Sequence, residues 1–208
     1  MRNLLTLLLH HGLDPNVRFS QRSNHILLSL MDMVQNARAP KDLTYVYDLT
    51  LTLMTYGANP NIIIDDPCVD NDYDFNDHSS PAKYKISTIY TTPKNLVIYH
   101  YVQLLMRKNQ LWVNDQDLHF ARILRLYYFA MNHAEVYACL RVLLAQTGMN
   151  PTKTALFSVI RDLHSKPRTL KQLARISIYN SIKQKPAFYA NKLPLPPSLR
   201  EYLMSFEP

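Results

Sequence analysis

Glycine and cysteine are both scarce in this chain of 208 residues, which has three glycines and two cysteines. An all-β fold with many tight turns uses more glycine, so the shortage favours an all-α fold. Cys68 and Cys139 are too few for a disulfide framework, which indicates a reducing compartment and a cytoplasmic or nuclear location. The composition, 47% hydrophobic and 19% charged, is typical of a globular chain.

Long apolar runs are absent too. No segment has the ~20 consecutive apolar residues that a membrane-spanning helix requires. The apolar run that begins at Leu4 stops at His10, which is early for a signal peptide, and no small-residue cleavage site follows it. We therefore expect no membrane segment and no secretory signal.

Residues that catalysis usually requires are missing as well. A RING domain needs about eight paired cysteine and histidine ligands for its two zinc ions, and two cysteines cannot supply them. Neither cysteine lies near a visible base, and there is no glycine-rich phosphate-binding loop. The sequence therefore predicts no catalytic residue, no metal site and no cofactor.

Two segments of the chain, Leu7–Asn16 and Thr52–Asn61, share one pattern. Each is an apolar helical stretch, then a glycine, then Asp/Asn-Pro-Asn. Gly12 and Gly57 suit the left-handed conformation that ends a helix, and the proline that follows each of them cannot continue it. A weaker copy of the same pattern occupies Leu143–Pro151. Repetition of one helix ending indicates a helical repeat protein.

The repeated pattern resembles the second helix and exit turn of the ankyrin repeat, Leu-Leu-x-x-Gly-Ala-Asp/Asn-Pro/Val-Asn. The two glycines are 57 − 12 = 45 residues apart, against about 33 in a regular ankyrin unit, so extra residues are expected around 36–44. The resemblance implies an all-α fold, an irregular ankyrin-type helical repeat solenoid over residues 1–155. A generic helical hairpin with a glycine stop is the alternative.

Met1 falls where the second helix of a repeat is expected, which indicates that earlier repeats are missing from this chain. The first helix would then lack a neighbour on one side, and an uncapped solenoid end exposes apolar surface. Leu5, Leu8 and Leu9 are predicted to form that exposed face.

An acidic insertion near residues 62–90 interrupts the repeats. It holds six aspartates between Asp65 and Asp77 with no basic residue among them. The run Asp70–Asp74 resembles the start of a calcium-binding loop, but Phe75 stands where glycine is needed and Pro81 where the bidentate acid is needed. We interpret the segment as a solvated loop; a contact for a basic partner is the alternative.

The C-terminal residues carry two further motifs. The first is Thr-Leu-x-x-Leu-Ala-Arg-x-x-Ile over 169–178, and the second is Leu-Pro-Leu-Pro followed by Leu-x-x-Tyr-Leu over 193–203. Their order and separation resemble the SOCS box, whose elongin-binding motif reads Ser/Thr-Leu-x-x-Leu-Cys-Arg-x-x-Ile and whose cullin box contains Leu-Pro-Leu-Pro. With the repeats in front, the chain resembles the ankyrin repeat and SOCS box proteins.

The resemblance implies a SOCS box over 156–208, with an elongin-binding helix at about 168–184 and a cullin box at about 192–204. It implies that elongin C, paired with elongin B, binds Thr169, Leu170, Leu173, Ala174 and Ile178. It implies that cullin-5, with its RING partner, binds Leu193, Pro194, Leu195 and Pro196. The family usually has cysteine where Ala174 stands, which predicts somewhat weaker elongin C binding.

Spacing alone supports the same interpretation. Leu170, Leu173, Ala174 and Ile178 share one face of a helix that must end before Pro186, and we expect Leu170 to be the exposed anchor for a partner's groove. The alternative is that these leucines pack on the chain's own repeats. Further on, Ser198 and Glu201 have the spacing of a capping box that begins a short helix.

The sequence therefore predicts a non-catalytic adaptor that holds an unknown target protein for ubiquitination. One alternative is an ankyrin-type interaction scaffold that recruits no ligase. A second arises because Arg161–Lys192 holds eight basic residues and one acid, 8 − 1 = +7, as in some nucleic-acid-binding proteins. No pattern of stacking aromatics accompanies those charges, so nucleic-acid binding is not expected.

Overall fold

The structure is a computed structural model that describes residues 2–17, 25–37, 40–62, 64–65, 85–86, 93–107, 117–132, 134–148 and 154–206. Its α-helices are α1 (Arg2–His10), α2 (Ile26–Asn36), α3 (Pro40–Thr55), α4 (Val97–Arg107), α5 (Asp117–Ala130), α6 (Val136–Gly148), α7 (Thr154–Ser165), α8 (Leu170–Ser181), α9 (Pro186–Tyr189) and α10 (Pro197–Ser205). Two 3-10 turns, Pro93–Asn95 and Ala190–Lys192, accompany them.

Helix dominates the described residues, as the shortage of glycine predicted. The exception is a ribbon of two short antiparallel strands, β1 (Ile64–Asp65) and β2 (Lys85–Ile86). Most of the expected acidic insertion, including Asp70–Asp74, lies outside the described residues. None of the described helices is both long and apolar enough to cross a membrane.

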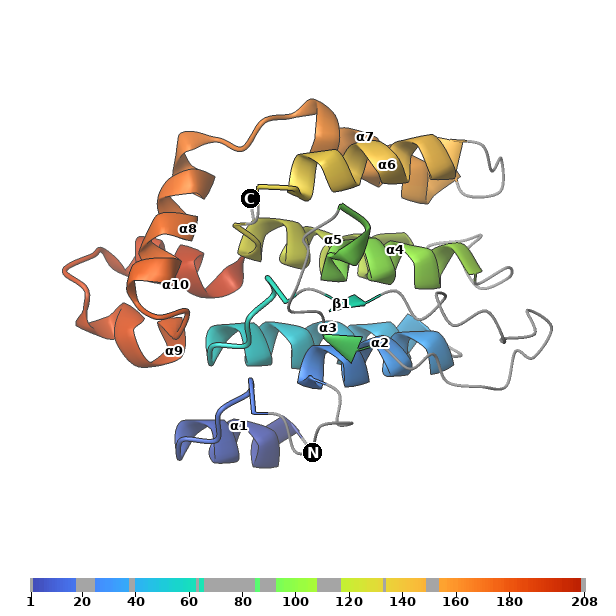
Figure 1. Cartoon of the computed structure of the whole chain (residues 1–208). Coiled ribbons are helices and arrows are strands. Elements are labelled where there is room, and N and C mark those ends of the chain that lie inside the picture. The colour runs from blue at the N-terminus through green and yellow to red at the C-terminus, as the bar shows by residue number, and fades with distance from the viewer. Residues whose placement is uncertain are drawn as a thin grey trace.

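The helices stack in layers, and the C-terminal helices run along one side of the stack. Figure 1 shows α1 at one end, then α2 with α3, then α4 with α5, and α6 with α7 at the other end. Within the stack α2 packs on α4 and α4 on α6, while α3 packs on α5 and α5 on α7. This layered pairing is the arrangement that a helical repeat requires, because each layer buries its apolar face against the next.

A continuous core runs through these layers. It includes Leu27 of α2, Leu43 of α3, Tyr101 of α4 and Leu140 of α6, none of which has any exposed surface. The hydroxyl of Tyr101 donates to the carbonyl of Phe120 at 3.2 Å, so this buried polar group is satisfied. The stack is therefore packed through its interior from the second layer to the last.

The two glycine helix endings are confirmed. Gly12 and Gly57 have φ values of +99° and +104°, the left-handed conformation that was predicted for them. After the second ending, the amide of Ala58 returns to the carbonyl of Leu53 at 2.9 Å. The third expected ending differs, because Gly148 is the last residue of α6 itself and the residues after it lie outside the described part of the chain.

Asparagine side chains join these exit turns from one layer to the next. The side-chain amide of Asn16 donates to the carbonyl of Gly57 at 2.7 Å, and its side-chain oxygen accepts the amide of Asn59 at 2.8 Å. One layer further, the side-chain oxygen of Asn61 accepts the amide of Asn132 at 2.9 Å. The turns after α1, α3 and α5 therefore form a ladder along one edge of the stack.

The prediction for the exposed face of α1 is correct only for Leu8, which is 46% exposed. Leu9 is 1% exposed and Leu5 is partly buried, because positions four apart on the helix share the face that packs on the core. Leu4 and Leu7 take their places on the outside, at 60% and 53% exposure. The apolar surface that was expected at this end is present, on a different face of the helix.

Candidate functional site

The helix α8 begins with a capping box. The Thr169 hydroxyl accepts the amide of Gln172 at 3.2 Å, and the side chain of Gln172 accepts the amide of Thr169 at 2.9 Å. Two amides that would otherwise lack partners at the helix start are thereby satisfied. Thr169, which was predicted to contact a partner, therefore caps α8 within the chain.

The outer face of α8 carries the predicted partner-binding residues. Leu170 is 86% exposed and Leu173 is 47% exposed, and Ala174 beside them is also exposed. Ile178, two turns beyond Leu170, is half-buried. A leucine with so much exposed surface leaves apolar area that burial against another molecule would stabilise.

The inner face of α8 is packed against the chain. Gln172, Arg175, Ile176 and Tyr179 are buried. The alternative that the leucines of this helix pack on the chain's own repeats therefore does not hold for Leu170, because other residues of α8 make those contacts. One face of this 12-residue helix is packed against the chain, and the opposite face is exposed.

Arg175 is the most unusual residue of the inner face, since it is only 2% exposed. Its guanidinium lies 5.4 Å from the ring centre of Phe129, 4.9 Å from that of Tyr202 and 5.5 Å from that of Phe206. It also donates to the carbonyl of Phe129 at 3.4 Å. Burial lowers the pKa of the Arg175 guanidinium from its usual range, yet arginine keeps its charge in proteins. The ring faces stabilise that charge by cation–π contacts.

The predicted cullin-binding residues form an extended segment after the short helix α9. Leu193 has φ −77° and ψ 141°, and Pro196 has φ −55° and ψ 151°, both close to polyproline II geometry. Pro194 and Pro196 are exposed, whereas Leu193 and Leu195 are half-buried. Arg200 holds the segment in place by donating from Nε to the carbonyl of Leu195 at 2.8 Å.

The capping box predicted at Ser198 and Glu201 is wrong. α10 begins at Pro197, and its N-cap residue, Pro196, makes no side-chain hydrogen bond. Proline has the φ of a helix and lacks the amide that a cap would satisfy, so Pro197 can start the helix ahead of the serine. Leu203, the last residue of the second motif, is buried in this helix, and so is Phe206, which the sequence did not single out.

Neither a nucleophile nor a metal site is evident in the described part of the chain. Cys139 is buried, and burial raises the pKa of its thiol to about 12, which keeps it protonated and unreactive. No group of three or more potential metal ligands occurs among the described residues. What the C-terminal residues present is an exposed face on α8 and an extended segment before α10.

Residues 166–204 match the SOCS box family. SOCS boxes recruit elongin B/C and a cullin, and proteins that carry one serve as adaptor subunits of ubiquitin ligases. The match therefore supports an adaptor role, with elongin B/C and a cullin as partners. It covers both predicted motifs and includes α8, α9 and most of α10.

The comparisons support no other part of the chain. No family match covers the repeats, so the ankyrin-type solenoid stays a prediction. No curated protein and no solved structure matches the chain.

Proposed function

We propose that this protein is the substrate-recognition adaptor of a ubiquitin ligase built from elongin B, elongin C, cullin-5 and its RING partner. Residues 156–208 recruit the ligase, and the ankyrin-type layers of residues 1–155 hold a target protein. The adaptor itself is not catalytic. It speeds ubiquitin transfer by holding the target close to the charged conjugating enzyme, which raises the effective concentration of the reacting groups.

The observation that carries this proposal is the outer face of α8, where Leu170 is 86% exposed on a helix whose other face is anchored. A preformed helix that projects a leucine beside a small residue suits insertion into a partner's groove. In the proposal elongin C takes Leu170, Leu173 and Ala174, with Thr169 and Ile178 at the two ends of the contact.

The extended segment of the cullin box supports the second half of the proposal. Pro194 and Pro196 restrict the backbone, so little conformational entropy is lost when Leu193 and Leu195 meet a partner. We assign these four residues to cullin-5. The proposed site of action is the cytoplasm, where a reducing environment suits the buried free thiol of Cys139.

The decisive experiment is co-expression of the full chain with elongin B and elongin C, followed by gel filtration. We expect the three proteins to elute together and to retain cullin-5 when it is added. If a folded chain elutes separately from elongin B/C, the adaptor proposal fails and the ankyrin-type scaffold takes its place. Salt-sensitive retention on nucleic acid, lost when the basic residues between Arg161 and Lys192 are neutralised, would instead favour nucleic-acid binding.

Replacing Ala174 with cysteine is expected to tighten elongin C binding. Ala174 is exposed on the outer face of α8, and the added sulfur extends the apolar contact by about one methylene-sized group, worth roughly 0.8 kcal/mol. Isothermal titration with elongin B/C should show a dissociation constant about three- to fivefold lower. Ala174→Ser is the control of similar size without the apolar gain, and equal affinity of the two variants would contradict this account.

A further inference from the structure

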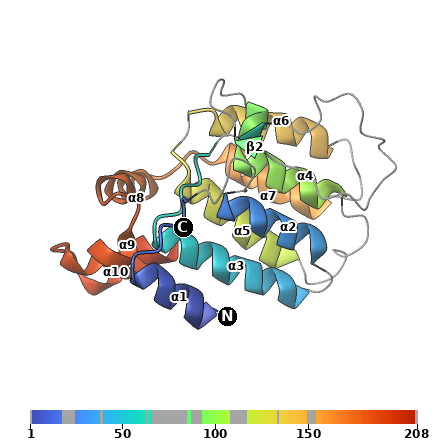
Figure 2. The same cartoon turned by 60° about the horizontal axis from the view of Figure 1, so that its bottom comes forward.

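The three C-terminal helices cross the ends of the layers rather than forming another layer. After α7, at one end of the stack, the chain turns back and runs against the stacking direction, with α8 nearest the later layers and α9 nearest α1 (Figures 1 and 2). The edge that they cross is the one where α1, α3 and α5 end. We call residues 168–206 the strap.

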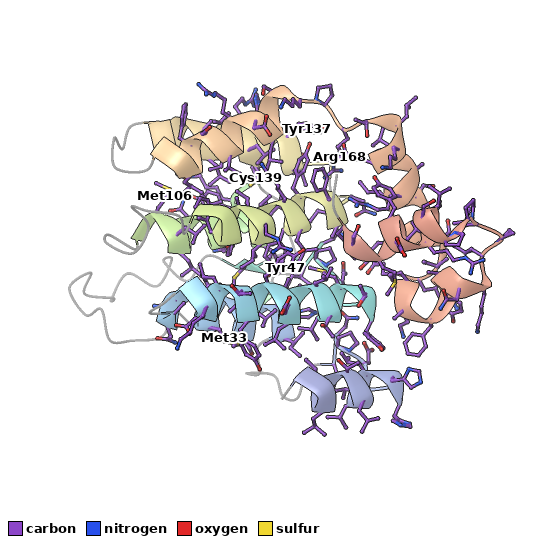
Figure 3. The ribbon with its side chains drawn as sticks, turned by 180° about the vertical axis from the view of Figure 1, so that it is seen from behind. Met33, Tyr47, Met106, Tyr137, Cys139 and Arg168 are labelled. Carbon is purple, nitrogen blue, oxygen red and sulfur yellow. The ribbon has the colours of Figure 1, made fainter. Side chains whose placement is uncertain are left out.

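At the level of α5, two arginines of the strap bind the end of that helix. The Arg168 guanidinium donates to the carbonyl of Tyr128, and that of Arg175 donates to the carbonyl of Phe129 at 3.4 Å. Both carbonyls belong to the last turn of α5, where the helix dipole presents its negative end, so cations are favourable there. The amide of Arg168 also donates to the Tyr137 hydroxyl at 3.2 Å, which ties the strap to α6 (Figure 3).

At the level of α3, the strap binds the next helix end. The buried hydroxyl of Tyr179 donates to the carbonyl of Met54 at 3.0 Å. Just beyond, the glycine of the exit turn lies against the strap so closely that a Cβ on Gly57 would stand 2.9 Å from Cγ of Lys185. The equivalent turn after α1 has open space at Gly12, so the close approach is specific to this layer.

At the level of α1, the strap makes aromatic contacts. The ring of Phe188 stacks on His10 at 6.0 Å between centres, with 13° between the planes. The same ring meets Tyr56 edge-on at 5.5 Å. His10 is the last residue of α1, so Phe188 holds the end of the helix that has the least packing in the stack, with Leu4, Leu7 and Leu8 left exposed.

From these contacts we infer that the strap holds together the ends of α5, α3 and α1, and that elongin C binding on the outer face of α8 stabilises α1. The first part rests on the contacts within the chain. The second part rests on the proposed function as well. Arg175 and Tyr179 point inward from the same helix that presents Leu170 and Leu173 outward, so a partner that holds α8 in its folded conformation also holds its inner contacts. A ligand that binds only the state in which these inner contacts are formed shifts the equilibrium toward that state.

Hydrogen exchange measured by mass spectrometry tests the inference on the full chain. In the free protein, Phe188→Ala should speed exchange of the amides in the second half of α1 about tenfold, because an aromatic contact is lost at a marginal helix. Tyr189→Ala is the matched control, since Tyr189 is the next residue of α9, is 37% exposed and stacks on neither His10 nor Tyr56. It should leave α1 unchanged. Equal exchange rates of the α1 amides in the wild type and in Phe188→Ala would overturn the inference that the strap stabilises α1.

The elongin part is tested on the complex with elongin B/C. We expect α1 of the wild type to exchange several-fold more slowly in the complex than alone, and we expect Phe188→Ala to abolish most of that gain while α8 stays protected. A complex that forms but leaves α1 exchange unchanged would overturn the coupling. If no complex forms, the proposed function fails, and the coupling to elongin C fails with it. The comparison of Phe188→Ala with the wild type in the free chain still decides whether the strap stabilises α1.

Discussion

Leu170→Asp is expected to weaken elongin C binding at least a hundredfold while the chain stays folded. Burial of a leucine side chain in a partner's pocket contributes roughly 1.5–3 kcal/mol, and an aspartate there adds the cost of desolvating a carboxylate. A loss of about 3 kcal/mol or more corresponds to two powers of ten in the dissociation constant. Because Leu170 is 86% exposed, the free energy of unfolding should change by less than about 0.5 kcal/mol.

The matched control for this variant is Leu7→Asp. Leu7 is also a leucine on the exposed face of a helix, at 53% exposure, but it belongs to α1 rather than to α8. Titration calorimetry with elongin B/C should give the wild-type affinity for Leu7→Asp and little or no heat for Leu170→Asp. Similar losses in both variants would mean that the effect is general to the fold and that α8 is not the contact.

Arg175→Ala is expected to lower the free energy of unfolding by about 3 kcal/mol. It removes a charged hydrogen bond to the carbonyl of Phe129 and three cation–π contacts, and it leaves a cavity between α5, α8 and α10. Part of this destabilisation is offset, because the variant no longer has to bury a charged guanidinium away from water. Urea denaturation followed by circular dichroism measures the difference.

Two further variants separate the charge from the volume. Arg175→Met keeps most of the side-chain length and should cost clearly less than alanine, about 1 kcal/mol, since it loses the polar contacts but fills the space. Lys171→Ala removes an exposed cation that lies 4.0 Å from the ring centre of Tyr202, and its effect should stay within about 0.5 kcal/mol. If methionine costs as much as alanine, the charge rather than the packing holds the strap in place.

Local patterns in the sequence predicted the features whose causes are local. Gly12 and Gly57 were identified because a left-handed helix ending favours glycine whatever surrounds it. Leu170 and Leu173 were placed on one face by their spacing alone, and both are exposed on that face. The SOCS box match to residues 166–204 agrees with the two motifs from which the box was predicted.

The features that were missed depend on residues far apart in the chain. Asn16 was noted only as the last residue of the repeated pattern, because its partners in the next turn are more than 40 residues away and leave no local signal. Burial of Arg175 runs against the usual exposure of arginine, and only the meeting of α5 and α10 around it creates the site. The error at Ser198 was local, since a proline one position earlier already starts the helix.

The hydrogen bond from Tyr179 to Met54 also has a consequence for how the chain is made. It joins residues 125 positions apart, and contacts of that separation form late because the intervening chain must first be brought together. A ribosome releases α3 long before it has synthesised Tyr179, which binds the end of that helix, and Phe188, which contacts the end of α1, follows later still. The nascent protein therefore emerges before the strap can contact its earliest helices. We expect chaperones to bind it until the last helices leave the exit tunnel.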